Sequence, residues 1–245
     1  MLELDGVTVR FGDVVAVREV SLTVAEGELL MLLGGSGSGK TTTLETINRL
    51  VEPTEGTVRL RGEDVRALVP HELRRRIGYC FQGTGLFAHL TVAENVGITP
   101  RLLGWPPERV AARVAELLEL VELPAELAAR LPDQLSGGQA QRVGVARALA
   151  AEPELVLFDE PFGALDPITR ESLQASFTRV RRETGLTGVF VTHDVIEALT
   201  LGDRVAVLRD GALVALGTAA ALRESDDPYV RKLLDAPRRA LGALA

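Results

Sequence analysis

Cysteine and lysine are scarce in this sequence, and each scarcity has a consequence. Cysteine occurs once, as Cys80, which excludes a disulfide within the chain and indicates a reducing compartment. Cys80 lies in the apolar run IGYCF, so we expect a small, buried, hydrophobic side chain. Lysine occurs only at positions 40 and 232, and every other basic residue is arginine. The lysine at position 40 therefore stands out.

Long hydrophobic runs and an excess of positive charge are also missing. No segment reaches the roughly 18 consecutive apolar residues that would span a bilayer. The N-terminus, MLELDGVTVR, lacks the basic and then apolar profile of a secretory signal. The net charge of −7 argues against a protein whose main partner is nucleic acid. We therefore expect a cytosolic chain unless something else holds it at a membrane.

The hydrophobic spacing predicts a mixed α/β protein. Alternating apolar residues over the first thirty positions predict antiparallel strands with one solvent-facing side, whereas the unbroken run LLMLLG at 29–34 predicts a strand buried on both faces. From about residue 86 the spacing becomes helical, and the segment PAELAARLP continues this pattern. After Pro153 strands and helices alternate again. The simplest architecture is an α/β core interrupted by a helical insertion.

The buried strand at 29–34 ends in a glycine-rich loop. Residues 34–41, GGSGSGKT, fit the pattern G-x-x-x-x-G-K-[ST] and lie between a buried strand and a predicted helix, which is the context the pattern requires. Glycines let backbone N–H groups converge on a phosphate, Lys40 neutralises the outer phosphates, and the Thr41 hydroxyl can bind Mg²⁺. An ordinary glycine turn does not need this whole set, so the loop predicts a nucleotide site.

Polar side chains follow three other predicted strands. LVLFDEP ends in Asp159, placed to reach a Mg²⁺ shell, and Glu160, placed to polarise a water molecule. His193 ends the strand in VTHD, and Gln82 ends IGYCFQ. Taken singly, the carboxylates fit a solvated strand end, and His193 and Gln82 fit structural roles equally well.

A Ser-Gly-Gly turn precedes another predicted helix. In QLSGGQAQR, residues 134–142, free N–H groups and the positive end of the helix dipole would point the same way, which suits an anion. A serine-capped helix with flexible glycines is the alternative.

Each of these motifs is weak evidence alone, but six of them occur in a fixed order along the chain, which is a specific pattern. GGSGSGKT, Gln82, LSGGQ at 135–139, LVLFDEP, GALD at 163–166 and His193 together resemble the nucleotide-binding ATPase of an ABC transporter, over about residues 2–235. The resemblance implies an α/β P-loop NTPase fold, a mixed β-core with an antiparallel β-subdomain and a helical insertion. The implied domains are a RecA-like and antiparallel-β ATP-binding core at 1–85 and 154–235, a helical signature subdomain at 86–153 and a C-terminal tail at 236–245, with no separate regulatory domain.

The resemblance also implies ATP and Mg²⁺ as cofactors and a role for each site residue. Glu160 would activate water, His193 would hold the γ-phosphate, and Thr41, Gln82 and Asp159 would serve Mg²⁺. Phe11 would stack on adenine, a role that needs only an aromatic ring. The residues that would hold ATP on the same chain are Phe11, Gly34, Gly35, Ser36, Gly37, Ser38, Gly39, Lys40, Thr41 and Thr42.

By the same resemblance the chain works as a head-to-tail pair, most simply a homodimer. The residues expected to contact ATP held by the facing chain are Leu135, Ser136, Gly137, Gly138, Gln139 and Asp166. The other implied partners are two membrane-spanning permease subunits and a solute-binding protein that acts through them, which would place the chain on the cytoplasmic face of the cell membrane. Leu86, Phe87 and Leu90 could form an exposed patch for the permease, or could pack against the insertion.

Several stretches, including TTTLETINRLVEPTEG, HELRRRIGY, GLFAHLTVAENV and LLGW, resemble the ATPases of importers for glycine betaine, choline and carnitine. An importer ATPase for another small solute, such as an amino acid or a polyamine, and an ABC ATPase without a transport role are the alternatives. Four positions depart from the resemblance. Phe11 stands where tyrosine is commoner. Gly35 and Ala88 stand where proline is commoner, and Gly163 stands where serine is commoner.

Overall fold

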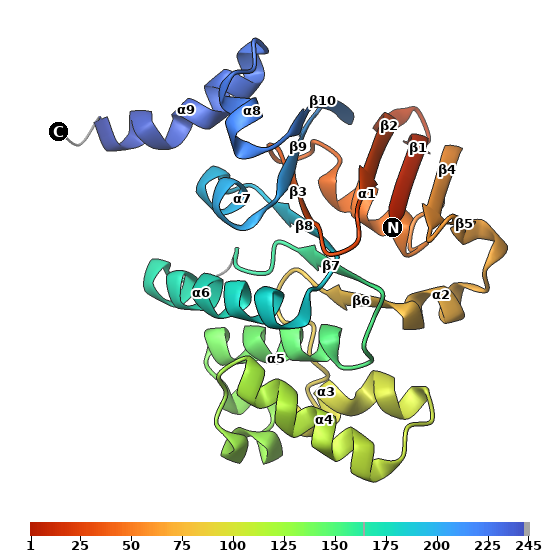
Figure 1. Ribbon diagram of the computed structural model, residues 1–245, viewed down its shortest axis with the longest axis vertical. Coiled ribbons are helices and arrows are strands. Elements are labelled where there is room, and N and C mark those ends of the chain that lie inside the picture. The colour runs from red at the N-terminus through yellow and green to blue at the C-terminus, as the bar shows by residue number, and fades with distance from the viewer. Residues whose placement is uncertain (164, 243–245) are drawn as a thin grey trace. The chain divides into compact units, whose positions relative to one another are not determined.

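The computed structural model describes residues 1–163 and 165–242, and it divides into two compact units. One unit is Met1–Pro70 with Thr187–Ala245, and the other is His71–Leu186. Figure 1 labels the elements of both. The last three residues of the predicted C-terminal tail lie outside the described residues, whereas helix α9 (Pro228–Gly242) covers most of that tail.

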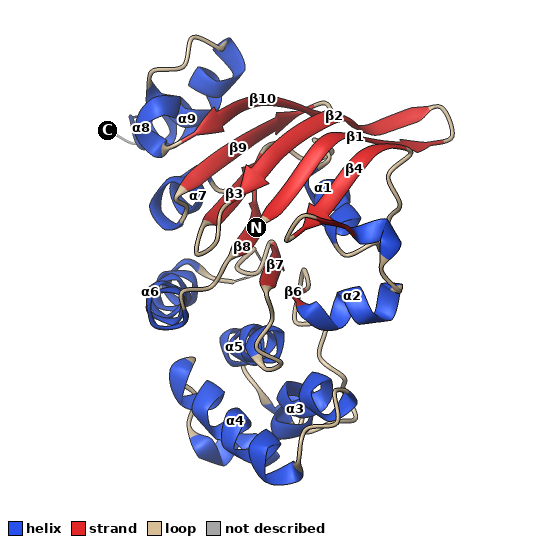
Figure 2. Cartoon of the chain, turned by 45° about the vertical axis from the view of Figure 1, so that its right-hand side comes forward, coloured by secondary structure: helices blue, strands red, loops and turns tan. Residues whose placement is uncertain are grey.

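The first unit contains an antiparallel sheet, as the alternating apolar residues predict. Its strands are β1 (Leu2–Phe11), β2 (Val14–Val24), β4 (Glu55–Leu60) and β5 (Glu63–Asp64), in the order β2-β1-β4-β5. Figure 2 shows β2, β1 and β4 side by side. The alternation along β1 changes phase between Leu4 and Val7, yet both side chains are buried. A register shift lies between these two residues, and Gly6 adopts a positive φ of 59° there. The bulge therefore returns the apolar side chains to one face.

The same unit holds a mixed set of strands around the predicted buried strand. They are β3 (Leu29–Leu33), β8 (Gly188–Thr192), β9 (Arg204–Arg209) and β10 (Ala212–Gly217), in the order β10-β9-β3-β8. β3 runs parallel to β8 and β9, and β10 is antiparallel to β9. Every residue of β3 is buried, which confirms the prediction of a strand covered on both faces. The α-helices of this unit, besides α9, are α1 (Lys40–Ile47), α7 (Val195–Leu201) and α8 (Ala219–Arg223), and Val65–Ala67 forms a 3-10 helix.

The second unit combines two parallel strands with most of the helices. Strands β6 (Ile77–Cys80) and β7 (Leu155–Asp159) pair in parallel. The helices are α2 (Pro70–Arg76), which starts at the boundary, α3 (Val92–Leu102), α4 (Pro107–Leu120), α5 (Gly137–Leu149) and α6 (Pro167–Thr184), and the short 3-10 helices are Ala125–Ala129 and Pro132–Gln134.

Helix α4 carries the apolar stripe that the sequence predicts. Val110, Val114, Leu117 and Leu118 are all buried. The helical pattern expected for PAELAARLP is wrong, because this segment forms only a 3-10 turn, Ala125–Ala129, and none of those five described residues is buried. Prolines bound the turn on both sides, and without an apolar face to bury, a longer helix has nothing to stabilise it.

Candidate functional site

The glycine-rich loop joins β3 to α1 in the first unit and is folded tightly over Lys40. The Lys40 ammonium donates hydrogen bonds to the carbonyl oxygens of Gly34 and Gly35, each at 2.9 Å. Lys40 is only 6% exposed. Gly37 and Gly39 adopt positive φ angles of 74° and 92°, a region open to glycine at little cost. The loop therefore surrounds the lysine with its own backbone.

Two glycines of this loop are required by close packing. A Cβ on Gly34 would lie 2.4 Å from the carbonyl oxygen of Leu208, and one on Gly39 would lie 2.5 Å from that of Ala16. Ser38 is buried beside them, and its hydroxyl has no hydrogen-bond partner among the described residues. A buried polar atom left in this state costs free energy unless a ligand or water satisfies it. The Ser38 hydroxyl thus fits a loop built to receive a polar ligand.

His193 and Phe11 belong to the same unit as the loop. β3 and β8 are parallel and Leu33 pairs with Thr192, so the loop after Leu33 and His193 after Thr192 start at the same sheet edge. His193 is exposed, and the next residue, Asp194, caps α7 by accepting N–H bonds from two residues of that helix. Phe11 ends β1 with 54% of its surface exposed, as a stacking residue needs.

The second unit brings Gln82, Asp159 and Glu160 to one sheet edge. β6 and β7 pair in parallel up to Cys80 and Phe158, so Asp159 ends β7 beside the start of the Gln82 segment. Asp159 is buried and Gln82 is exposed. Asp159 thus ends its strand as predicted, whereas β6 stops two residues before Gln82.

Glu160 has an unusual backbone. Its φ is +44°, the left-handed region that non-glycine residues rarely adopt, and the strain is on the order of 1 kcal/mol or more. Its carbonyl oxygen accepts a hydrogen bond from Gly163 N–H at 3.1 Å, which closes a tight turn after β7. Glu160 is half-buried. The chain therefore turns sharply at Glu160 and does not continue in the extended conformation of β7.

The LSGGQ segment starts helix α5 with a serine cap. The Ser136 hydroxyl accepts the N–H of Gln139 at 3.3 Å, and the Gln139 side chain accepts the N–H of Ser136 at 2.9 Å. The serine-capped helix left open by the sequence is therefore present. Ser136 and Gly137 are nevertheless exposed, so the helix start is open to a ligand. Gly138 is buried, and a Cβ there would lie 2.6 Å from Thr169 on α6.

Asp166 caps α6 in the same unit. Its carboxylate accepts the backbone N–H groups of Ile168 and Thr169, both at 3.1 Å. Hydrogen bonds from Thr169 are the main reason why the pKa of Asp166 lies below its usual value. Gly163 and Asp166 of the GALD stretch are described, and Ala164 lies outside the described residues.

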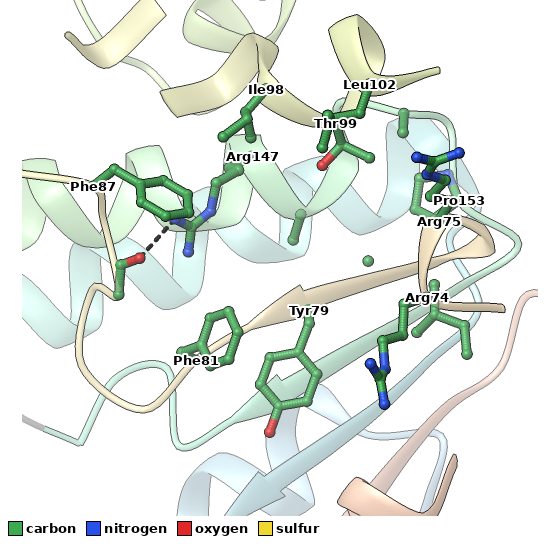
Figure 3. A pocket seen from close by; sticks show the side chains of 15 residues that line it. Arg74, Arg75, Tyr79, Phe81, Phe87, Ile98, Thr99, Leu102, Arg147 and Pro153 are labelled. Carbon is green, nitrogen blue, oxygen red and sulfur yellow. Dashed lines mark hydrogen bonds between the residues drawn. The ribbon is translucent and has the colours of Figure 1, made fainter. Parts of the chain in front are cut away.

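Arg147 is a site residue that the sequence did not single out. It lies in the last turn of α5, is 7% exposed, and donates to the carbonyl oxygens of Gly85 at 2.7 Å and Thr84 at 3.4 Å (Figure 3). Burial lowers its pKa. The rings of Phe81 and Phe87 lie 5.8 and 5.9 Å from its guanidinium, within cation–π range. Arg147 thus holds the segment after Gln82 against α5. The sequence offered one sign of this role, which is an arginine among the inward-facing residues of a predicted helix.

An apolar groove lies between this segment and α3 (Figure 3). It has a volume of about 470 Å³. Its lining includes Tyr79, Phe81, Phe87, Ile98, Leu102 and Arg147. Of the predicted patch, Phe87 is 44% exposed and lines the groove, whereas Leu86 and Leu90 are half-buried.

Asn95 fixes the shape of this segment. It is fully buried, accepts the N–H of Phe87 at 2.8 Å, and donates to the carbonyl oxygens of Phe87, Leu90 and Thr91. The groove is therefore bounded by an ordered loop.

Cys80 is buried, as predicted, and we expect its thiol to be unreactive. Burial raises its pKa to about 12, and Gln141 donates to the sulfur at 3.6 Å. Since the thiolate is the reactive form, the fraction available near neutral pH is very small.

We expect native protein at pH 8 to resist thiol-reactive dyes and alkylating agents. Burial both hides the sulfur and keeps it protonated, so labelling should proceed only as fast as the unit opens. Adding denaturant should expose one thiol per chain, because Cys80 is the only cysteine. Rapid labelling of the native chain, at a rate close to that of a free thiol, would contradict the burial of Cys80.

The predicted Mg²⁺ ligands are a hydroxyl, an amide oxygen and a carboxylate, which are the oxygen donors Mg²⁺ prefers. They belong to different units, with Thr41 in the first and Gln82 and Asp159 in the second. Within residues 1–163 and 165–242 there is no cluster of three or more His, Cys, Asp or Glu side chains able to hold a metal ion by themselves. Among the described helices none is long and apolar enough to cross a bilayer.

Known proteins resemble this chain along most of its length. The family model described as ABC transporter matches residues 17–163, more than half of the chain. The glycine betaine/carnitine/choline transport ATP-binding protein OpuCA of Bacillus subtilis (strain 168) is 48% identical over 240 residues, which cover 97% of this chain and 63% of that protein. The glycine betaine uptake system ATP-binding protein YehX of Escherichia coli (strain K12) is 50% identical over 217 residues, 89% of this chain and 70% of that protein. The chain spans less than two thirds of the length of several curated relatives.

A solved structure has the same fold. A dimeric ATP-binding cassette in a post-hydrolysis state, bound to ADP and Pi, superimposes with a TM-score of 0.79 and 36% sequence identity. The match covers 89% of this chain and 99% of that one. The two chains therefore share one α/β architecture.

Proposed function

This chain belongs to the ABC transporter family, and we propose that it is the ATP-hydrolysing subunit of a bacterial importer. ATP would close a dimer of two such chains, and closure would drive uptake of a small quaternary-amine osmoprotectant such as glycine betaine, choline or carnitine. The observation that carries the proposal is the glycine-rich loop, in which Lys40 is wrapped by backbone and the Ser38 hydroxyl is buried without a partner among the described residues.

The loop would bind the ATP phosphates in place of its own internal contacts. Backbone N–H groups of residues 36–42 would point at the phosphates. Lys40 would exchange the carbonyls of Gly34 and Gly35 for phosphate oxygens, which is favourable because a charged acceptor makes the stronger hydrogen bond. Phe11 would stack on the adenine ring.

Glu160 would act as the general base. Its carboxylate would take a proton from the water that attacks the γ-phosphate, and His193 would hold the γ-phosphate in position. Thr41, Gln82 and Asp159 would hold Mg²⁺, which when bound neutralises charge on the phosphates. The position of Glu160 directly after Asp159, at the sheet edge where β7 ends, supports this role.

The start of α5 would complete a site on a second chain. Ser136, Gly137 and Gly138 would contact the γ-phosphate of ATP held by the partner chain, with Asp166 at the seam. Leu135 and Gln139 flank this contact. The exposure of Ser136 and Gly137 supports the assignment, and the helix dipole adds to it.

The apolar groove lined by Phe87 is the proposed docking surface for a permease subunit. The wall of this groove includes Gly85 and Phe87, which follow Gln82 in the chain. A partner bound in the groove would therefore contact the segment next to a proposed Mg²⁺ ligand. Docked in this way, the chain would sit on the cytoplasmic face of the membrane, and the solute-binding protein would act through the permease.

We expect Phe87→Arg to weaken binding of the chain to its permease by about tenfold or more, because a charge would enter an apolar contact. Binding of labelled chain to permease in lipid nanodiscs measures the effect. Leu50→Arg is the matched control, since Leu50 is 48% exposed and does not line the groove. Equal affinity of the Phe87 variant and the wild type, at unchanged thermal stability, would remove the groove from consideration.

The transport function is tested with the complex. The chain, the permease and the solute-binding protein encoded beside it should be reconstituted in proteoliposomes, and ATP hydrolysis measured with glycine betaine, choline, carnitine, spermidine or an amino acid. We expect one of the quaternary amines to stimulate hydrolysis. Stimulation only by spermidine or an amino acid would replace the proposed solute, and an inability to bind the permease would favour an ATPase without a transport role.

A further inference from the structure

The first turn of the C-terminal helix contacts the glycine-rich loop. The N–H of Gly35 donates a hydrogen bond to the Tyr229 hydroxyl at 3.3 Å. Gly35 is also held on its other side, because its carbonyl oxygen accepts from the Lys40 ammonium at 2.9 Å. Both backbone groups of Gly35 are thus engaged, one by the lysine and one by the tyrosine.

Tyr229 is held in place by its own surroundings. The Asp227 carboxylate accepts the N–H groups of Tyr229 at 2.7 Å and Val230 at 3.0 Å, which fixes the start of α9. Val230 is fully buried. The Arg209 guanidinium lies 5.1 Å from the centre of the tyrosine ring, within cation–π range. The hydroxyl therefore reaches the loop from an anchored position.

The contact matters because of which residue stands at position 35. A proline there would restrict the backbone and would have no N–H to satisfy. Glycine leaves the empty loop more conformations, so more entropy is lost when a ligand orders it. The hydrogen bond to the tyrosine hydroxyl restricts the loop, and it satisfies the N–H of Gly35.

We propose that Tyr229 is a positioning residue that keeps the phosphate-binding loop in shape for ATP. This inference rests on the nucleotide site proposed above. When ATP draws the Lys40 ammonium away from the carbonyls of Gly34 and Gly35, the loop loses its contacts with the lysine. The bond from Gly35 to Tyr229 stays in place, so the loop does not have to be reordered.

Tyr229→Phe removes the hydroxyl and keeps the ring over Arg209. We expect ATP to bind about 2- to 10-fold more weakly, the range for losing one neutral hydrogen bond. The catalytic rate at saturating ATP should stay within about twofold, because the loss falls on loop order rather than on the reacting atoms. Calorimetric titration of ATP, with KM and kcat from phosphate release, separates the two quantities.

A double-mutant cycle distinguishes the hydrogen bond from a general effect on α9. In a Gly35→Pro background there is no N–H at position 35, and the proline ring carbon would point at the hydroxyl instead, so Tyr229→Phe should no longer weaken ATP binding. Gly35→Ala is the control, since it keeps the N–H and its Cβ would lie 3.7 Å from the tyrosine hydroxyl. In that background Tyr229→Phe should again weaken binding.

Three outcomes overturn the inference. They are an unchanged ATP affinity of Tyr229→Phe, an equal loss in the proline and glycine backgrounds, and a fall in kcat with unchanged KM. If Gly35→Pro does not fold, the comparison of the glycine and alanine backgrounds still decides whether the hydroxyl matters. A wild-type chain that binds no ATP at all would contradict the proposed function instead, so the two failures are separable.

Discussion

Glu160→Gln is expected to bind ATP with wild-type affinity and to lose hydrolysis by a factor of about 10² to 10⁴, the range for removal of a general base. Glutamine has the shape of glutamate but cannot accept a proton from water. Because ATP would remain intact at the seam, the variant should accumulate as an ATP-dependent dimer. Phosphate release measures the first effect, and light scattering with and without ATP measures the second.

The control for this change is Glu126→Gln, which removes an exposed carboxylate from a 3-10 turn in the same unit. It should hydrolyse ATP at the wild-type rate. The assignment of Glu160 fails if its glutamine variant also keeps the wild-type rate. If hydrolysis is lost but no ATP-dependent dimer forms, Glu160 is still the general base. The proposal that ATP closes a dimer of two chains would then be contradicted.

Ser136→Arg is expected to abolish ATP hydrolysis and to spare ATP binding by the isolated chain. Ser136 is exposed at the start of α5 and is not among the residues proposed to hold ATP on the same chain. In the proposed assembly Ser136 meets the γ-phosphate held by the partner chain, so a bulky side chain there would block closure. ATP binding is followed by titration and hydrolysis by phosphate release.

The arginine also removes the helix cap, which costs about 1 kcal/mol, so a second pair of variants isolates the contact with phosphate. Ser136→Asp and Ser136→Asn have nearly the same shape, and both residues cap helices well. The aspartate would repel the γ-phosphate, and the asparagine would not. Hydrolysis should therefore fall much further in the aspartate variant. Equal rates in the two variants would show that Ser136 caps α5 and has no phosphate beside it.

The sequence by itself determined the local chemistry of this protein. The glycine-rich loop, LSGGQ, and the carboxylates at the end of β7 are short segments whose predicted function depends on residue type and on neighbours along the chain. Strand β3 was predictable for the same reason, because burial on both faces leaves an unbroken apolar run. The cap at Ser136 was also readable, since a capping box spans only four positions.

The tertiary structure decided which distant residues support those segments. Arg147 meets the loop after Gln82 from a position 62 residues away from Gly85, and Tyr229 meets Gly35 across 194 residues. No local pattern specifies such contacts, because they form only when separate elements pack. The failed helix at PAELAARLP has the same origin, since a local pattern becomes a helix only when packing gives it a face to bury.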